Sequence, residues 1–222
     1  MKQWTIGIGV LFFLAVAGSA QSLNLKAGIF YPQQHSDLWD INTDNLTGGR
    51  ADMLNAYYGV EYENPVGRYA TIAFEIGNYS RTRYAEYVDF EHQDGSPINQ
   101  SFSLKMTPIE ATLRLYPNGH RRVFCPYVGV GVALYAWTYE QWGEFINQET
   151  WEVTEGSAET RSVAVGFTTR AGFLFRVRRN IGFSIEGKYN YAKGRLSDDF
   201  QDFELFDLSG FTATAGLNFY FD

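Results

Sequence analysis

The chain has a single cysteine, fewer basic than acidic residues, and almost no long apolar runs. Cys125 is the only cysteine among 222 residues, so no intramolecular disulfide can stabilise the fold. The formal net charge is −7, from 18 Lys and Arg against 25 Asp and Glu. This balance argues against nucleic acid as a partner, because nucleic acid requires a basic face. Past residue 20, no apolar stretch reaches the roughly 20 residues that a membrane-spanning helix needs.

The one long apolar run opens the chain and has the layout of a secretory signal peptide. A lysine precedes an apolar stretch over residues 4–16, and the small residues 17–20 follow it. This layout predicts a cleaved signal peptide over residues 1–20. Residues 21–222 then form one domain, long enough to bury a sizeable core.

What the chain does have throughout is alternation of apolar and polar residues, the pattern of half-buried β-strands. Aromatic residues make up 17% of the chain and there are 22 glycines, which is typical of β-architecture. Eight segments alternate in this way and are predicted as strands, over residues 23–31, 54–62, 69–79, 109–116, 126–136, 163–177, 181–191 and 210–221.

The connections between these segments alternate between long and short. The rhythm predicts an all-β fold, an eight-stranded antiparallel up-and-down β-barrel with its long loops at one rim. The long connections are residues 32–53, 80–101, 140–161 and 192–209, and the short ones are residues 63–68, 117–123 and 178–180.

The second long connection contains a turn signal. Apolar and polar residues alternate on both sides of Asp94 and Gly95, a dipeptide that favours a hairpin. Strands three and four are therefore predicted to continue as a ribbon that could recruit a partner by strand addition. The phase of the alternation changes near Thr107 and Pro108, which predicts a β-bulge there.

The polar face of the strands carries every charged residue of the strand cores and all but one of their glycines. An eight-stranded barrel has an interior just wide enough for side chains, so small and charged residues suit the lumen and bulky apolar residues suit lipid. The inverted arrangement, a soluble secreted barrel, would crowd the apolar side chains into that lumen, so a transmembrane β-barrel is predicted. Buried ions require partners. A lumen network is therefore predicted from Lys26, Glu61, Glu75, Glu110, Arg114, Arg170, Glu186 and Lys188.

Three segments carry a family resemblance: PIEATLRLYP at 108–117, PYVGVGVALY at 126–135, and the last strand. They resemble the small outer-membrane β-barrels of Gram-negative bacteria, the OmpA/OmpX/OmpW-like porin-family domain. The resemblance implies residence in outer-membrane lipid and assembly by machinery that reads a C-terminal signal. That signal normally ends on an aromatic residue, whereas Asp222 ends this chain. The matching residues are Thr214, Gly216, Phe219 and Phe221.

The resemblance leaves the role open, because this fold hosts adhesins, anchors, enzymes and channels. Lumen size favours a plugged, monomeric barrel in a structural or surface-interaction role, without cofactors. The alternative is a narrow channel for small or apolar solutes. A lipid-modifying enzyme is the third hypothesis. His35, next to Ser36, His92 and His120 all fall outside the strands and have no serine and carboxylate at alternating spacing, so an enzyme is not predicted.

The long loops are acidic and the short turns are basic. Asp40, Asn42 and Asp44 alternate as calcium ligands do, but Asn45 and Ala51 stand where a calcium loop has Gly and Glu. A solvated acidic loop is therefore predicted rather than a metal site. The long loops are predicted to bind a surface ligand or protein. The basic residues of the short turns are Arg68, Arg121, Arg122, Arg178 and Arg179.

Overall fold

The structure is a computed structural model that describes residues 21–146, 152–200, 203 and 205–221. The predicted signal peptide over residues 1–20 lies outside the described residues. None of the described helices is long and apolar enough to cross a membrane.

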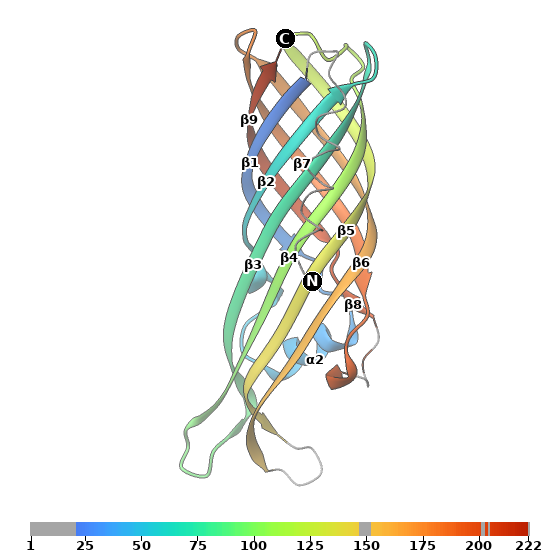
Figure 1. Cartoon of the computed structure of the whole chain (residues 1–222). Helices are drawn as coiled ribbons and strands as arrows, with labels where there is room; N and C mark the ends of the chain where they lie inside the picture. The colour runs from blue at the N-terminus through green and yellow to red at the C-terminus, as the bar shows by residue number, and fades with distance from the viewer. Residues whose placement is uncertain (1–20, 147–151, 201–202, 204, 222) are drawn as a thin grey trace, which may run out of the picture.

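Within the described residues, eight antiparallel strands close into a barrel (Figure 1). Each strand pairs with the next along the chain, and the last pairs with the first, from Gln21 opposite Phe221 to Pro32 opposite Gly210. The predicted eight-stranded antiparallel barrel is confirmed. Its strands are β1 (Gln21–Pro32), β2 (Asn55–Pro65), β3 (Ala70–Glu91), β4 (Pro97–Leu115), β5 (Phe124–Ile146), β6 (Val153–Arg176), β7 (Ile181–Gly194) and β9 (Gly210–Phe221).

The connections at one end of the barrel contain short elements that the sequence analysis took for loops. The helix α2 (Asp37–Asn45) follows β1 and has Ser36 at its N-cap. Two aspartates lie in its first turn, where negative charge interacts favourably with the helix dipole. The remaining elements are η1 (Arg50–Met53), η2 (Asp198–Phe200) and β8 (Phe206–Asp207), a two-residue strand that pairs with the end of β7.

Strands β3 to β6 are much longer than predicted and project beyond the other strands as two hairpins (Figure 1). The ribbon predicted around Asp94 and Gly95 is confirmed, since β3 ends at Glu91 and β4 begins at Pro97. Gly95 adopts a φ of 81°, the left-handed conformation that favours glycine in such a turn.

The predicted bulge near Thr107 and Pro108 is wrong. The β3–β4 register runs without a shift from Ala70 opposite Leu115 to Glu86 opposite Asn99, and the irregularity lies beyond Glu86. Along β4 the inward positions stay the same but change character. Nearest the short turns they are polar, and toward the hairpin they are apolar. The alternation in the sequence changes phase because the apolar residues move from the outer face of β4 to its inner face. The strand itself continues without a bulge. The inward apolar residues include Ile98, Phe102, Leu104 and Met106.

The outward face of the barrel carries aromatic side chains at two levels. Each of β6, β7 and β9 has a pair of outward aromatic residues eight positions apart, which is about 26 Å along a strand at 3.3 Å per residue. A strand tilt of roughly 40° reduces this to about 20 Å of height, close to the apolar band of an outer-membrane barrel. The pairs are Phe175 and Phe167, Phe183 and Tyr191, and Phe219 and Phe211.

Inward glycines make room for inward tyrosines on neighbouring strands. A Cβ on Gly77 would lie 2.1 Å from the Tyr57 hydroxyl, and one on Gly172 would lie 2.6 Å from the Tyr127 hydroxyl. Gly187 faces outward, and a Cβ there would meet no atom within 4 Å. The segregation of glycine therefore follows from interior packing.

Substitution of Gly77 by alanine is expected to destabilise the barrel by about 1–3 kcal/mol, because overpacking strains a filled interior. Tyr57 cannot move freely, since its hydroxyl donates to Glu75 and accepts from Lys188. The matched control is Gly187→Ala. Urea midpoints in detergent micelles measure both, and equal midpoints for the two variants would contradict this explanation.

Candidate functional site in the barrel interior

The structure brings the eight charged residues of the predicted network together inside the barrel. They come from six different strands, and none is more than 4% exposed. Buried ions are tolerated only when each has partners, so the pairing decides whether this interior can exist. The residues are Lys26 on β1, Glu61 on β2, Glu75 on β3, Glu110 and Arg114 on β4, Arg170 on β6, and Glu186 and Lys188 on β7.

Lys26 is surrounded by carboxylates from three strands. Its Nζ lies 2.7 Å from Glu61, 2.8 Å from Glu75 and 2.9 Å from Glu186. A lysine ammonium has three N–H donors, so these three acceptors use its full capacity. The contact with Glu186 joins residues 160 positions apart in the chain.

Arg170 and Lys188 share the remaining carboxylates. The Arg170 guanidinium lies 2.9 Å from Glu75, 3.1 Å from Glu61 and 3.4 Å from Glu186, and it also bonds Glu110. Lys188 Nζ lies 2.7 Å from Glu110 and 3.1 Å from Glu75. Each carboxylate therefore touches more than one cation, which makes the group a network and not a set of separate pairs.

Arg114 does not contact Glu110, its neighbour on the same strand face. Its guanidinium lies 2.8 Å from Glu186 and 3.2 Å from Glu63, and it also bonds Glu61. Glu63 was missed by the sequence analysis, which ended the second strand at residue 62. The continued alternation of Glu61 and Glu63 is the signal that would have found it.

Tyrosine hydroxyls complete the network. Tyr57 donates to Glu75 at 2.6 Å, Tyr127 to Glu186 at 2.8 Å, and Tyr116 to Glu63 at 2.5 Å. Two of these rings also lie beside cations, with Lys188 4.8 Å from the Tyr57 centroid and Arg114 4.8 Å from that of Tyr127. Hydrogen bonds and cation–π contacts thus compensate part of the cost of removing these charges from water.

A second interior layer, toward the long hairpins, is aromatic. Trp39 of α2 stacks on Phe206 with centroids 5.0 Å apart, and Trp137 stacks on Phe206 at 5.3 Å. The Trp39 indole N–H donates to the Asp207 carbonyl at 3.1 Å, and Asn42 donates to the Tyr139 hydroxyl at 2.8 Å. Helix α2 and strand β8 are therefore bound into the barrel interior at its long-loop end.

The weak calcium candidate lies on helix α2. Asp40 pairs with Arg50 at 2.8 Å, whereas Asn42 points inward to Tyr139. Helical residues two positions apart do not face each other, so the oxygens of Asp40, Asn42 and Asp44 do not converge. Within the described residues, no three His, Cys, Asp or Glu side chains are grouped as metal ligands.

The three histidines lie far from one another and make separate contacts. The His35 backbone N–H donates to Asp207 at 2.8 Å, and the His92 ring lies 3.0 Å from Glu144. The backbone N–H of Asn99 donates to Glu144 at 2.8 Å and lowers the pKa of that carboxyl. Burial lowers the pKa of His120, whose Nδ1 donates to the Arg68 carbonyl at 3.0 Å.

The residues of the predicted assembly signal lie on β9 with alternating orientation. Thr214 and Gly216 face the interior, whereas Phe221 is exposed and Phe219 half-buried on the outer face. A Cβ on Gly216 would lie 2.3 Å from Asn24 and 2.5 Å from Ser184, so interior packing requires glycine here.

A closed ring of eight antiparallel strands with two outward aromatic levels has the fold of a small outer-membrane β-barrel. Solved structures agree. The chain is similar to OprG of Pseudomonas aeruginosa, an outer membrane protein (TM-score 0.58, 12% identity, 92% of this chain and 96% of that one). It is also similar to Neisserial surface protein A (TM-score 0.52, 11% identity, 91% of this chain and 97% of that one). No protein-family model and no curated protein sequence matches the chain. The predicted resemblance is thereby confirmed for the fold.

Proposed function

We propose that the protein is a monomeric barrel of the Gram-negative outer membrane whose plugged, charge-paired lumen conducts no solute. In this proposal a signal peptide exports it and the outer-membrane assembly machinery inserts it. The observation that carries the proposal is the buried network, in which five carboxylates, Glu63 included, pair with four cations across the barrel. The aromatic layer with α2 supports it, because it fills the same interior nearer the long hairpins.

The role that fits a plugged barrel is structural or surface interaction through the long loops. The projecting hairpins carry exposed acidic side chains, among them Glu86, Asp89, Glu91 and Asp94 on the first and Glu155 and Glu159 on the second. Their separation from the basic short turns gives the molecule opposite charges at its two ends. A ligand or protein with a basic surface suits the acidic end by charge complementarity.

Planar-bilayer recording tests the proposal. The purified, refolded chain is expected to give no reproducible single-channel steps, because no ion can pass the network without breaking several buried ion pairs. A porin reconstituted in the same lipid provides the positive control. Discrete steps of constant size in repeated recordings would contradict a plugged lumen.

The alternative, passage of small or apolar solutes, has one observation in its favour. A cleft of about 580 Å³ opens beside α2 at the long-hairpin end, and most of its lining side chains are apolar or aromatic, including Leu38, Tyr87, Phe145 and Phe200. Such a cleft suits an apolar ligand. Small-solute swelling of vesicles that contain the protein, absent in empty vesicles, would favour this function over the plugged barrel.

A further inference from the structure

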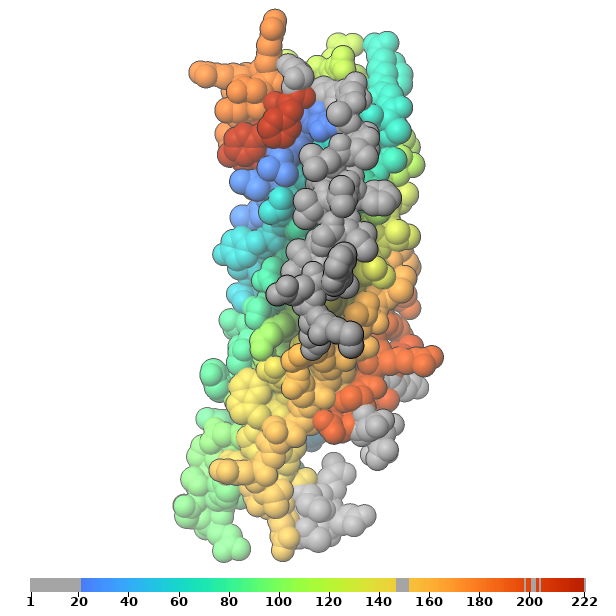
Figure 2. All heavy atoms as spheres, in the orientation of Figure 1, coloured from blue at the N-terminus to red at the C-terminus, as the bar shows by residue number. Residues whose placement is uncertain are grey.

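The short-turn end of the barrel carries five exposed arginines on three turns. Arg68 lies between β2 and β3, Arg121 and Arg122 between β4 and β5, and Arg178 and Arg179 between β6 and β7. All three turns lie at the upper end in Figure 1, where the side chains of the β6–β7 turn (orange) project from the barrel in Figure 2. These five residues are called the arginine rim.

Among the described residues, acidic side chains do not balance the positive charge of the arginine rim locally. Among described residues 21–23, 63–70, 115–124, 175–183 and 219–221, the only acidic side chain is Glu63. Glu63 is 6% exposed, and its carboxylate already accepts hydrogen bonds from Thr71, Tyr116 and Arg114. No described acidic side chain therefore competes with an external anion for the rim.

The rim lies directly beyond the outward aromatic residues. Tyr69 follows Arg68, Phe124 is two residues past Arg122, and Phe175 is three before Arg178. One to three residues span about 3–10 Å along a strand. The headgroup region on each side of a bilayer is roughly 5–8 Å thick, the difference between total and hydrocarbon thickness. The guanidinium groups therefore lie at the level of lipid phosphates.

The residue type also points to phosphate. Every rim cation is arginine, whose planar fork of N–H donors matches phosphate oxygens in pairs, whereas lysine acts as a point charge. The chain uses lysine elsewhere, inside the barrel at Lys26 and Lys188 and on the long-hairpin side at Lys105 and Lys193.

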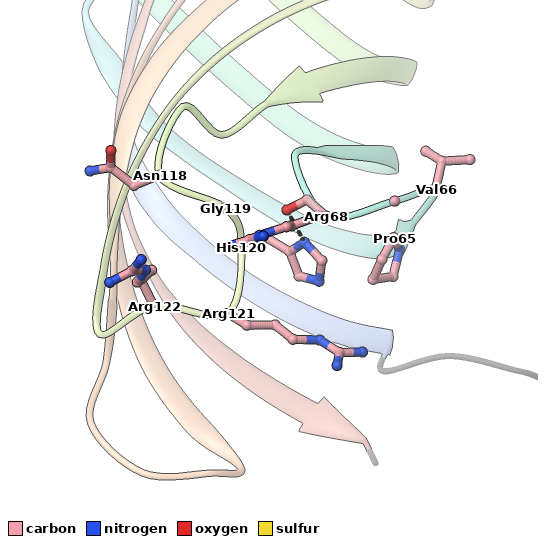
Figure 3. A pocket seen from close by; sticks show the side chains of 9 residues that line it. Pro65, Val66, Arg68, Asn118, Gly119, His120, Arg121 and Arg122 are labelled. Atoms are coloured by element: carbon pink, nitrogen blue, oxygen red, sulfur yellow. Dashed lines mark hydrogen bonds between the residues drawn. The ribbon is translucent and has the colours of Figure 1, made fainter.

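The rim contains a preformed hollow. An open pocket of about 650 Å³ lies between the β2–β3 and β4–β5 turns and is lined by Arg68, Asn118, His120, Arg121 and Arg122 among others (Figure 3). The His120 ring donates to the Arg68 carbonyl at 3.0 Å and ties the two turns together. Burial lowers the pKa of the His120 ring.

We propose that the arginine rim binds the phosphate groups of phospholipid headgroups, with preference for anionic phospholipids in the leaflet that the short turns face. The proposal depends on the transmembrane fold and is independent of whether the lumen conducts. Each basic residue near an anionic surface contributes about a fivefold preference. The arginine rim is therefore expected to enrich anionic lipid around the barrel several-fold.

Spin-labelled lipids test the proposal with the full chain reconstituted in phosphatidylcholine vesicles. The measured quantity is the association constant of labelled phosphatidylglycerol relative to labelled phosphatidylcholine. The rim variant replaces Arg121, Arg122, Arg178 and Arg179 by glutamine. Its matched control replaces Lys105, Arg161, Lys193 and Arg195 by glutamine, which changes the net charge equally at the acidic end.

The wild type and the control are expected to prefer the anionic lipid several-fold, and the rim variant is expected to lose most of this preference. No preference in the wild type, or equal loss in both variants, would overturn the proposal.

Two further experiments test whether the rim binds another anion. Rim-dependent binding of inorganic phosphate by the protein in detergent, with no lipid preference in vesicles, would assign the rim to soluble phosphate. Sedimentation with cell-wall peptidoglycan that the rim variant loses, while this variant keeps the lipid preference, would assign the rim to that polymer. Either result would overturn the lipid assignment.

Discussion

Removal of residues 219–222 is expected to prevent the chain from inserting into the outer membrane. Phe219, Tyr220 and Phe221 pair with Leu23, Ser22 and Gln21, and these contacts close the ring at the short-turn end. Without them, backbone N–H and C=O groups at the ends of β1 and β7 lack hydrogen-bond partners at the membrane boundary. Each unpaired group inside a bilayer costs several kcal/mol. The deletion also removes both aromatic residues of the proposed assembly signal.

Cell fractionation with a heat-modifiability gel measures this effect. The truncated chain is expected to be missing from the outer-membrane fraction and degraded in the periplasm. Deletion of Asp222 alone, a residue outside the described part of the chain, is the control and is expected to leave levels normal because the aromatic pattern ends before it. Normal levels of the four-residue deletion, with its folded-form gel shift intact, would refute both the closure argument and the proposed signal.

Replacement of Arg114 by alanine is expected to destabilise the folded barrel by roughly 3–5 kcal/mol, because it leaves buried carboxylates without their cation. Arg114 contacts Glu61, Glu63 and Glu186, and the side chains of all three are at most 8% exposed. Lys26 and Arg170 also contact Glu61 and Glu186, but no other ion pair of the described residues reaches Glu63. Urea unfolding in lipid vesicles measures the loss.

The control for this substitution is Arg161→Ala. The Arg161–Glu159 pair has the same 2.8 Å separation as Arg114–Glu186, but its side chains are 74% and 49% exposed against 2% and 3%. Solvent-exposed pairs contribute little to stability, so this variant is expected to show no measurable change. Equal urea midpoints for both variants would mean that the interior pair is solvated.

The barrel itself could be predicted because two periodic properties of the sequence agree. Alternation gives the strands, and the placement of charge and glycine gives the inner face; both follow from local geometry. The ion-pair partners could not be predicted in the same way. Glu110 and Arg114 share a face and a strand, yet Glu110 bonds Arg170 and Lys188. The partners depend on the stagger between strands, which periodicity within one strand does not contain.

The long hairpins and α2 show a second limit of the sequence. Strands β3 to β6 were predicted too short because their apolar residues change faces partway along, as at Met106 and Ile109 on β4. That change reflects the change of surroundings from lipid to water, and a single strand does not reveal it. Helix α2 is only nine residues long, and its buried face of Leu38, Trp39 and Asn42 is too short to show a helical period.

The change of face along β4 and its neighbours sets how deep the protein can sit in a bilayer. On the outer face of β4, Ile109 is the last apolar side chain before Lys105, whose side chain is 52% exposed. In a thicker membrane, sliding of the barrel would move this lysine, together with Thr138 on β5, into hydrocarbon. At the opposite boundary, the arginines of the short turns oppose sliding in the other direction. The protein therefore cannot adapt to hydrophobic mismatch by vertical movement, and the surrounding lipid must thin or thicken to match it.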